Sequence, residues 1–420
     1  MEKALLVSIQ LKTDKGHWRI DDIAFELEEL ANSTSVEVVE NIAAICEKAT
    51  ANYLIGKGKA EEIKFVAEEE NVDTVIFSHD LSGTQQRNLE ELIGKKIIDR
   101  TQLILDIFSR RAKSPEGKMQ VELAQLEYLL PRLVGKGIIL SNLGGGIGTR
   151  GPGETKLEVD RRRIRKKIDG LKKDLESFSL HRLTMHKRRE KNNLPLVALV
   201  GYTSAGKSTL LNRLTQSNQV TSEKLFTTLD PLSKNVRLSN GQDIVLSDTV
   251  GFLHELPHHL IEAFKATLEE VRGADLLIHV LDVSDKRLYQ HAKAVQEVLG
   301  ELGTEDKPVI VALNKIDQEQ DRSWLEVTRK DFANSILISA KTGEHIDDLI
   351  CAIEEHFYAM MVSLRIEIPH TRMEMLDYFY RAGKVESVSY LPEGIRVEVN
   401  IPRKVYAIIG QDKDLKISVR

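Results

Sequence analysis

Residues 196–215 read LVALVGYTSAGKSTLLNRLT, and this stretch decides the fold. An apolar run predicts a buried strand, and Gly201 to Ser208 then match the pattern G-x-x-x-x-G-K-[ST] before a helix begins. Glycines let the loop fold tightly, so that its backbone N–H groups face phosphate oxygens. The stretch therefore predicts a phosphate-binding loop, or P-loop, between a strand and a helix.

Individual side chains of the P-loop have separate expected tasks. Lys207 reaches the β- and γ-phosphates, and the Ser208 hydroxyl binds Mg²⁺. A glycine-rich turn without a ligand is the alternative, and the motifs that follow in the chain argue against it. The expected contacts to the nucleotide in this stretch are Gly201, Tyr202, Thr203, Ser204, Ala205, Gly206, Lys207, Ser208 and Thr209.

Further motifs follow apolar runs that each predict a strand. Asp248-Thr249-Val250-Gly251 follows IVLS, where the carboxylate can hold the Mg²⁺ shell and the Gly251 N–H can sense the γ-phosphate. Asn314-Lys315-Ile316-Asp317 follows VIVAL, and Ser339-Ala340-Lys341 follows ILI.

The last two motifs are expected to select the base. The Asp317 carboxylate can accept hydrogen bonds from N1 and N2 of guanine, a paired donor edge that adenine lacks. Lys315 can lie along the base plane, and the segment Ser339–Lys341 would place a backbone N–H at the guanine O6. Four motifs in this order, each at the carboxyl end of a strand, predict GTP or GDP as the ligand rather than an adenine nucleotide.

The segment between the P-loop and Asp248 contains Phe226-Thr227-Thr228. A threonine in this interval can bind Mg²⁺ when the γ-phosphate is present. The local residues do not decide between Thr227 and Thr228, and all three residues are counted as expected nucleotide contacts.

Phe252 follows Gly251 at a position where many small GTPases have a glutamine that orients water. Because phenylalanine cannot hydrogen-bond water, we expect slow intrinsic hydrolysis that a partner must accelerate. Three histidines lie just beyond, and we expect them to face the solvent: His254, His258 and His259.

Size and composition frame these motifs. The chain has 420 residues and a net charge of −5, so it should form several domains, and its bulk charge does not indicate nucleic-acid binding. Two cysteines, Cys46 and Cys351, lie in apolar runs that read as helices and are expected to be small core residues. Neither a signal-peptide pattern nor a membrane-spanning apolar run is recognisable, so we expect a cytoplasmic protein.

Alternation of strand and helix patterns predicts an α/β fold. The expected domains are an N-terminal α/β domain (1–112), a helical arm with a Gly-rich loop (113–192), a Ras-like P-loop domain with a doubly wound sheet (193–362) and a small α+β domain (363–420). In the last of these, a strand, a helix near 373–382, a hairpin with a Pro-Glu-Gly turn and a final strand are expected.

The arm has a strong local charge. Residues 160–191 contain 13 Lys and Arg against 5 Asp and Glu, an excess of 8 positive charges in an otherwise acidic chain. Phosphate contacts from such a segment predict salt-sensitive RNA binding, whereas a solvated coiled-coil face paired with acidic neighbours is the alternative. The expected RNA contacts are Gly144, Gly145, Gly146, Arg150, Arg161, Arg162, Arg163 and Arg165.

Longer stretches around these motifs closely resemble the HflX family of translation-associated GTPases, over about residues 1–360. The resemblance rests on FTTLDP (226–231), DTVGFLHELPHHLIEAFKATLEE (248–270), GGGIGTRGPGETKLEVDRRRIR (144–165), IGKGKAEEI (55–63), LSGTQQRNLE (81–90) and DRTQLILDIFSRRAKSPEGKMQVELAQLEYLLPRL (99–133). Two departures occur: Ser204 stands where the family usually has Asn, and the sequence after Leu229-Asp230-Pro231 varies.

Several expectations follow from this resemblance. It implies a coiled-coil arm, binding to the large ribosomal subunit (50S) and its rRNA, ribosome-stimulated hydrolysis and, in some members, splitting of stalled or idle ribosomes. It places the family's second threonine of this segment on Thr228. The expected catalytic residues are then Lys207, Thr228 and Gly251, and the expected Mg²⁺ ligands are Ser208, Thr228 and Asp248.

Two other functions remain open from the sequence. One is an NTP-dependent RNA-remodelling enzyme whose N-terminal domain also uses ATP. The other is a ribosome assembly or binding factor in which GTP is a structural switch. The free protein is expected to be monomeric.

Overall fold

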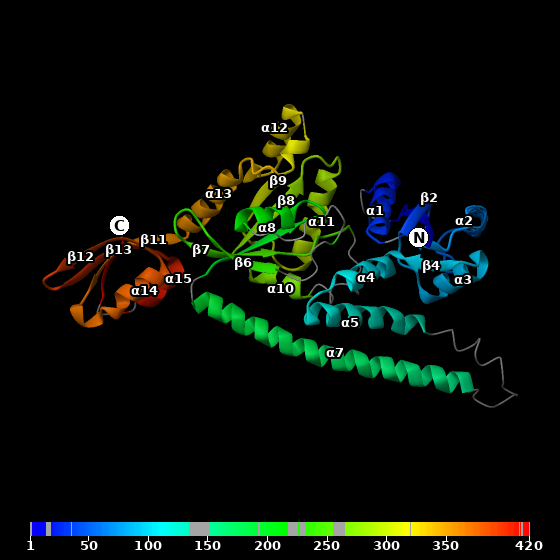
Figure 1. Cartoon of the computed structure of the whole chain (residues 1–420), viewed down its shortest axis with the longest axis horizontal. Helices are drawn as coiled ribbons and strands as arrows, with labels where there is room; N and C mark the ends of the chain where they lie inside the picture. Colours follow the sequence, from blue (N-terminus) through cyan, green and yellow to red (C-terminus); the bar gives the residue numbers. More distant parts are fainter. Residues whose placement is uncertain are drawn as a thin grey trace.

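The computed structural model describes residues 2–13, 18–34, 36–133, 152–191, 194–216, 226, 232–254, 265–319, 321–410, 412 and 415–419. Expected site residues outside these ranges are Gly144, Gly145, Gly146, Arg150, Thr227 and Thr228, and the same holds for His258 and His259. Within the described part, the strands form three sheets joined by helices (Figure 1).

The first sheet is parallel and has the order β2-β1-β3-β4. Its strands are β1 (Glu2–Leu11), β2 (Val36–Cys46), β3 (Thr74–Phe77) and β4 (Lys96–Asp99), and its helices are α1 (Ile20–Asn32), α2 (Lys57–Glu69), α3 (Gly83–Ile93) and α4 (Arg100–Arg111). Alternate residues of β1 serve opposite faces: Leu5 packs with α2 and α3, and Leu6 with α1 and α4.

Both expectations for the cysteines are wrong. Cys46 ends strand β2 and is half-buried, because NIAAIC continues the β2 ladder beside β1 instead of starting a helix. Cys351 does lie in a helix, but its side chain is exposed.

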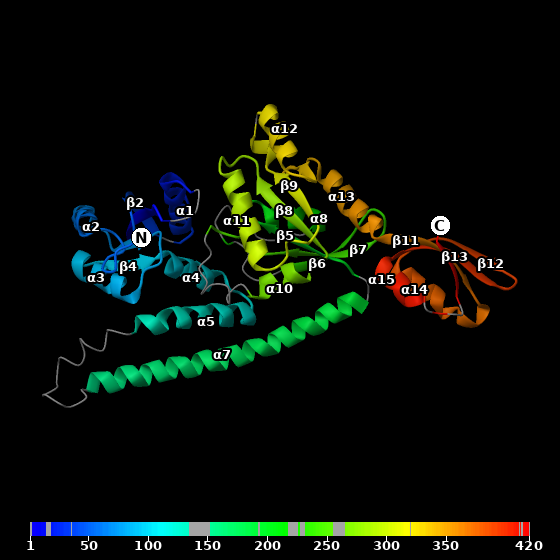
Figure 2. The ribbon, with the colours of Figure 1, turned by 180° about the vertical axis from the view of Figure 1, so that it is seen from behind.

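Two helices form the arm, α5 (Pro115–Arg132) and α7 (Pro152–Lys191), and α7 is 40 residues long. They lie side by side in both views of the ribbon (Figures 1 and 2). Their shared apolar seam contains Leu123 of α5 together with Ile168 and Leu171 of α7. Spacing of three residues between Ile168 and Leu171 keeps both on one face of α7, as a helical pair requires.

The third region is a six-stranded sheet with the order β10-β9-β8-β5-β7-β6. Strands β5 (Leu196–Gly201), β7 (Asp243–Asp248), β8 (Leu276–Asp282), β9 (Val309–Asn314) and β10 (Ser335–Leu337) are parallel, and β6 (Leu232–Arg237) runs antiparallel to β7. Helices α8 (Lys207–Thr215) and α13 (Ile346–Ala359) cover one face, and α10 (Lys265–Gly273), α11 (Leu288–Glu301) and α12 (Arg322–Asp331) lie on the other. The doubly wound sheet is confirmed, and the sequence did not predict the edge strand β6.

A four-stranded antiparallel sheet follows α13, with the order β12-β13-β11-β14. Its elements are β11 (Met361–Ile368), α14 (Glu374–Ala382), β12 (Lys384–Leu391), β13 (Gly394–Pro402), α15 (Arg403–Ile409) and β14 (Lys416–Val419). Phe379 of α14 and Val405 of α15 pack on the sheet. The α+β class and the hairpin at Pro392-Glu393 are confirmed, whereas α15 was not predicted.

Candidate functional site

The P-loop lies where β5 ends and α8 begins. Gly201 has φ +156° and Gly206 has φ +96°. A Cβ atom added to Gly201 would lie 2.4 Å from the Val280 carbonyl oxygen, and one added to Gly206 would lie 2.3 Å from the Asn314 side-chain nitrogen. Both positions therefore need glycine, because the loop passes close to β8 and β9.

Lys207 is the first residue of α8, and its side chain folds back under the loop. Its Nζ donates hydrogen bonds to the carbonyl oxygens of Gly201 (3.0 Å) and Tyr202 (2.7 Å). Burial lowers the pKa of Lys207 to about 8, against an opposing effect of the Asp248 carboxylate. A dehydrated ammonium group of this kind gains stability from a phosphate placed in the loop.

Two hard oxygen donors meet beside Lys207. The Ser208 hydroxyl donates to Asp248 Oδ2 over 2.6 Å, so the ends of α8 and β7 are in direct contact. A hydroxyl and a carboxylate are donors that Mg²⁺ accepts, with phosphate and water oxygens completing its octahedral shell. The donor set therefore fits this ion. Among the described residues, no group of three or more His, Cys, Asp or Glu side chains could hold a metal by itself.

Residues after β7 contact the P-loop through the backbone. The Thr203 N–H donates to the Phe252 carbonyl oxygen (3.0 Å), and the Phe252 N–H donates to the Gly201 carbonyl oxygen (3.1 Å). A Cβ atom on Gly251 would lie 2.8 Å from Thr203 Cα. The Gly251 backbone thus lies directly beside the phosphate loop. The Thr249 hydroxyl donates to the Leu199 carbonyl oxygen (2.6 Å) and supports the sheet.

Two aromatic residues are in unexpected places. Phe226 was expected at the nucleotide, but its side chain is buried and packs edge-on against Phe108 of α4, with ring centroids 4.7 Å apart. Phe252 is also buried, in the core shared by the N-terminal and P-loop domains. The absence of a hydrogen-bonding group at 252 therefore has a packing reason, because this side chain is part of that core.

The base-binding motifs form a connected hydrogen-bond network. Asn314 donates from Nδ2 to the Ala205 carbonyl oxygen (2.8 Å) and accepts at Oδ1 from the Ala340 N–H (2.9 Å). The Ser339 hydroxyl donates to Asp317 Oδ1 over 2.7 Å. These bonds tie the P-loop and the two base-binding motifs to one another. Lys315 has φ +68°, and its Nζ lies 2.5 Å from Asp282 Oδ2.

Arg213 of α8 is a site residue that the motifs did not reveal. Its Nη2 donates to the Lys341 carbonyl oxygen (2.6 Å), and its Nε donates to that of Ala340 (3.4 Å). Its guanidinium group also approaches Gly343, where a Cβ atom would lie 3.2 Å from Cζ. In the sequence, its only signal was a single cation near the end of STLLNRL. Arg213 holds the loop that carries the expected guanine O6 contact.

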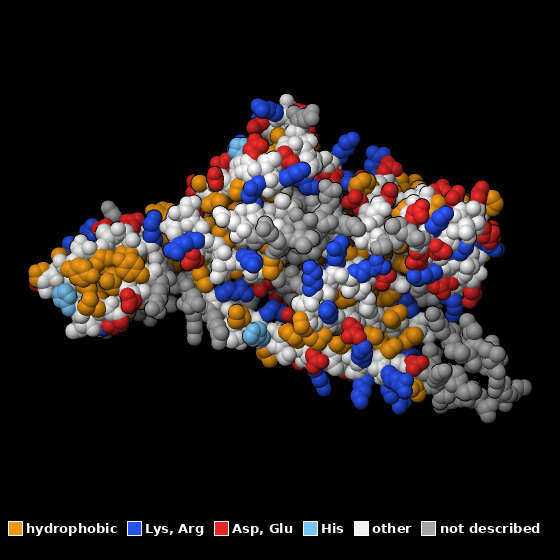
Figure 3. Space-filling model, in the orientation of Figure 1, with side chains coloured by type: hydrophobic (Ala, Val, Ile, Leu, Met, Phe, Trp, Pro, Cys, Tyr) orange, Lys and Arg blue, Asp and Glu red, His pale blue; other side chains and the backbone are white. Residues whose placement is uncertain are grey.

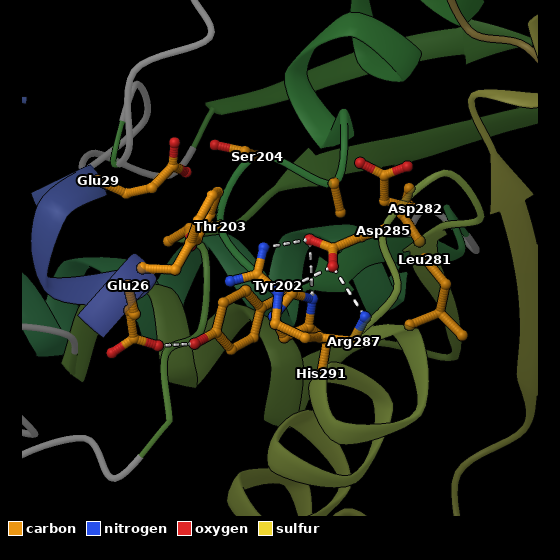
Figure 4. A pocket seen from close by; sticks show the side chains of 13 residues that line it. Glu26, Glu29, Tyr202, Thr203, Ser204, Leu281, Asp282, Asp285, Arg287 and His291 are labelled. Carbon is orange, nitrogen blue, oxygen red and sulfur yellow. Dashed lines mark hydrogen bonds and ion pairs between the residues drawn. The ribbon is translucent and has the colours of Figure 1, made fainter. Parts of the chain in front are cut away.

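The N-terminal domain contacts the P-loop directly through α1. The Tyr202 hydroxyl donates to Glu26 (Figure 4). Glu26 also pairs with Arg100 of α4. The His254 N–H donates to the Tyr202 hydroxyl (3.1 Å), and Arg100 donates to the His254 carbonyl oxygen (2.5 Å). Burial, followed by the charge of Glu26, raises the pKa of Tyr202. We call Glu26, Arg100, Tyr202 and His254 the interdomain contact.

Stacked rings surround the interdomain contact. Trp18 stacks on His254 with centroids 4.3 Å apart, and Tyr202 stacks on His291 of α11 at 3.9 Å. The expectation that His254 faces the solvent is therefore wrong, because its ring is used in domain packing. Figure 4 also shows the Asp285 carboxylate bonded to Arg287 and close to His291.

The basic arm is partly neutralised by acidic neighbours. Lys167 pairs with Glu122 of α5, and Lys172 pairs with Glu127. Two further arginines pair with acidic residues at α10: Arg182 with Glu269 and Arg189 with Glu270. The alternative of a paired coiled-coil face thus describes one side of α7.

Another side of α7 remains cationic. Arg162, Arg165 and Lys166 are exposed, and no described residue forms an ion pair with them. Their spacing of three and four residues places them on one helix face. Arg161 is half-buried, and Arg163 lies 3.9 Å from Asp160. Figure 3 shows Lys and Arg side chains projecting along the arm at the lower edge of the molecule.

No helix of the described part has the length and apolar character needed to cross a membrane.

Comparison with known proteins identifies several similar sequences and structures. Family models match three consecutive regions: "GTP-binding GTPase N-terminal" (22–109), "GTP-binding GTPase Middle Region" (111–189) and "50S ribosome-binding GTPase" (196–315). Among solved structures, the chain is similar to a GTP-binding protein from Sulfolobus solfataricus in complex with GDP. That similarity has 25% identity and a TM-score of 0.43, and it covers 84% of this chain and 98% of the other.

Curated relatives match over nearly the full length. A GTPase HflX from Caldanaerobacter subterraneus subsp. tengcongensis is 45% identical over 400 residues, which covers 95% of this chain and 91% of the relative. The GTPase HflX of Escherichia coli is 39% identical over 403 residues, with 96% and 94% covered. With a P-loop, a neighbouring serine–aspartate pair and the three matched regions in one chain, this protein belongs to the HflX family of P-loop GTPases, which hydrolyse GTP.

Proposed function

We propose that this GTPase binds the large ribosomal subunit through its arm when GTP is bound, is activated there, and separates stalled or idle ribosomes. The observation that carries the proposal is the cationic face of α7, which comprises Arg162, Arg165 and Lys166. These three residues lie on a continuous helix that is anchored to the GTPase domain at its other end. The matched family model named for 50S ribosome binding supports the same partner.

The cationic face suits RNA because its charges are exposed and unneutralised by the described part of the chain. If each of these three cations neutralises one phosphate of an RNA duplex, the slope of log affinity against log salt concentration should change by about −0.9 for each contact. Lys167 and Lys172 belong to the paired side of α7 and hold the arm together instead. The remaining expected RNA contacts in the Gly-rich loop, residues 144–150, stay predictions.

We infer that the P-loop residues bind GTP as their geometry suggests. Lys207 contacts the β- and γ-phosphates after leaving the carbonyl oxygens of Gly201 and Tyr202. Asp317 accepts from the guanine edge while Ser339 fixes its carboxylate. Ser208 and Asp248 hold Mg²⁺, which neutralises phosphate charge, and Thr228 as a third ligand stays a prediction.

Slow hydrolysis by the free protein follows from the place of Phe252. Its side chain is 5% exposed and packed in the interdomain core, so it can neither reach nor orient a water molecule. A partner that orders the catalytic segments must then accelerate the reaction. We infer that the ribosome is this partner.

The interdomain contact supplies a route from the nucleotide to the N-terminal domain. The Gly251 N–H, which would sense the γ-phosphate, is three residues before His254 in the chain. Arg100 holds the carbonyl oxygen of His254, and Tyr202 accepts from its N–H. Movement of this backbone on binding or hydrolysis therefore changes the contacts of the N-terminal domain.

Sedimentation of intact ribosomes tests the proposal. The protein with a non-hydrolysable GTP analogue should bind the large subunit and convert intact ribosomes to subunits, and the GDP form should do neither. The variant Arg162→Gln/Arg165→Gln/Lys166→Gln should lose most binding and keep its basal GTP hydrolysis. A matched control neutralises three cations on the N-terminal domain, Lys57, Lys64 and Arg87, whose acidic neighbours lie on the same helices. Equal binding by both nucleotide forms would refute nucleotide-dependent action.

A further inference from the structure

The C-terminal domain lies outside all three matched family regions, which end at residue 315. Between this domain and the GTPase domain lies a groove of about 350 Å³. On one side it is bounded by the turn between β6 and β7, and on the other by α14 and the start of β12. Figure 1 shows the C-terminal sheet beyond the end of α13, next to β7. The groove is thus built by two domains together.

Two exposed aromatic rings line this groove. Tyr358 at the end of α13 is 58% exposed, and Tyr380 of α14 is 59% exposed. A tyrosine in a domain interior buries its ring and bonds its hydroxyl group, whereas these two rings are open to a ligand. Flat rings at the mouth of a groove suit other flat, unsaturated groups, and nucleobases stack on such rings whatever their sequence.

Cations and an amide accompany the rings. Lys384 is exposed and has no ion-pair partner among the described residues. Arg237 is paired only loosely: its Nε lies 3.8 Å from Asp243, and their side chains are 75% and 53% exposed. Both cations can therefore turn to a phosphate. The Gln242 side-chain oxygen is buried in the groove wall and has no hydrogen-bond partner in the described part of the chain.

These groups together match the chemistry of unpaired RNA. Rings stack bases, and cations contact the phosphates between them. A cavity of this volume is at the lower end of the range for small ligands, about 300–1,000 Å³, so it excludes a duplex. A protein partner would need a broader apolar face than the groove offers.

We propose that this groove binds one or two unpaired RNA nucleotides, stacked on Tyr358 and Tyr380 with phosphates at Arg237 and Lys384. The C-terminal domain thereby adds a second RNA contact to that of the arm. This inference deepens the proposed ribosome binding and in part rests on it, because the RNA would be a loop or bulge of the ribosome.

Binding of a short oligonucleotide by the full chain tests the groove. A fluorescein-labelled oligouridylate of about eight nucleotides is titrated and followed by anisotropy. The variant Tyr358→Ala/Tyr380→Ala should bind about tenfold or more weakly, since stacking on one ring contributes about that factor. Tyr390→Ala is the matched control, because Tyr390 is 67% exposed on β12 but does not line the groove, and it should bind as the wild type.

The salt dependence of oligonucleotide affinity tests the phosphate contacts of Arg237 and Lys384. Arg237→Gln/Lys384→Gln should reduce the slope of log affinity against log salt by about 0.7 for each cation, the value for single strands. Lys416→Gln on β14 is the control, because Lys416 is exposed in the same domain and outside the groove. An unchanged slope in the double variant overturns the assignment of phosphates to these residues.

Crosslinking of the unmodified protein keeps the proposal testable even if a variant misfolds. An oligonucleotide containing 4-thiouridine should crosslink to peptides that contain Tyr358 or Tyr380. Crosslinks confined to residues 158–191 would overturn the groove and leave ribosome binding through the arm intact. If the tyrosine variant binds the oligonucleotide normally but loses binding to large subunits, the groove holds a ribosomal protein, and the RNA proposal is overturned.

Discussion

Replacing Tyr202 with phenylalanine removes one hydroxyl group from the contact between α1 and the P-loop. The ring keeps its stacking on His291, so the change is confined to hydrogen bonds. The hydroxyl group is a donor to Glu26 and an acceptor for the His254 N–H at 3.1 Å. Glu26 retains Arg100 as a partner, whereas the His254 N–H loses its acceptor.

The size of the effect follows from these partners. A buried donor left without an acceptor costs about 1–3 kcal/mol, and the loss of a hydrogen bond to a carboxylate is of the same order. Local opening of the segment around His254 should therefore become about 5 to 160 times more frequent in the variant. The double variant Glu26→Gln/Tyr202→Phe should increase this opening by less than the sum of the two single free-energy changes, because the two residues share one hydrogen bond.

Hydrogen exchange at the His254 amide, followed by mass spectrometry of the nucleotide-free protein, measures this opening. Tyr289→Phe is the matched control, since the Tyr289 hydroxyl also donates to a carboxylate, Asp331 (2.6 Å), but on the exposed side of α11. It should leave exchange at His254 unchanged. Exchange at His254 that stays within twofold of the wild type in Tyr202→Phe would refute the interdomain contact as the support of this segment.

Three more predictions concern charge and the base-binding loop. Burial lowers the pKa of Lys207 to about 8, and a bound phosphate would raise it again. GDP binding should therefore take up about one proton between pH 8 and 10.5, and the affinity should weaken as the pH rises. Calorimetry in buffers of different ionisation enthalpy measures this proton uptake. Burial, opposed by Asp285, lowers the pKa of His291 to about 4 from 6.5, so neutral His291 favours the folded state and this stability is lost as the pH falls from 6.5 to 4. In this range His291 should lower the free energy of unfolding by about 1.4 kcal/mol for each pH unit, and the thermal midpoint should fall with it. His291→Gln should make the thermal midpoint less dependent on pH. Arg213→Gln removes the hydrogen bonds to the carbonyl oxygens of Ala340 and Lys341, so GDP should dissociate about tenfold faster in stopped-flow measurements. Arg213→Lys should restore part of the loss. An unchanged dissociation rate in Arg213→Gln would contradict the idea that Arg213 holds this loop.

The turn of the P-loop between β5 and α8 was predictable because its requirements are local. Gly201, Gly206 and Lys207 must have fixed spacing to surround a phosphate, and that spacing is visible in the sequence. Strand β6 was not predictable, because LSKNVR has neither an apolar run nor clean alternation and is held as an edge strand by pairing with β7. Its strand character comes from a neighbour, which local propensity does not contain.

Contacts between distant segments were also outside the reach of the sequence. Nothing near Glu26 indicates that its carboxylate meets Tyr202, a residue 176 positions later. Tyr202 was assigned to the nucleotide because of its place in the loop, yet its side chain points away from the loop and into the domain contact. The arm shows the same limitation: the excess of positive charge was correct, but only the structure separates the paired Lys167 from the exposed Arg165.

Because α7 is long, a small change of its angle at one end moves its other end by several ångströms. Its 40 residues extend about 60 Å at about 1.5 Å per residue. Near its C-terminal end, Arg182 and Arg189 are fastened to Glu269 and Glu270 at α10, the first described helix after Gly251 in the chain. A tilt of about 5° at this fastening would displace the far end at Pro152 by about 5 Å, which is comparable to one helical turn. A small change of angle where α7 contacts α10 is therefore enlarged, by the length of the helix alone, into a displacement of several ångströms at its other end.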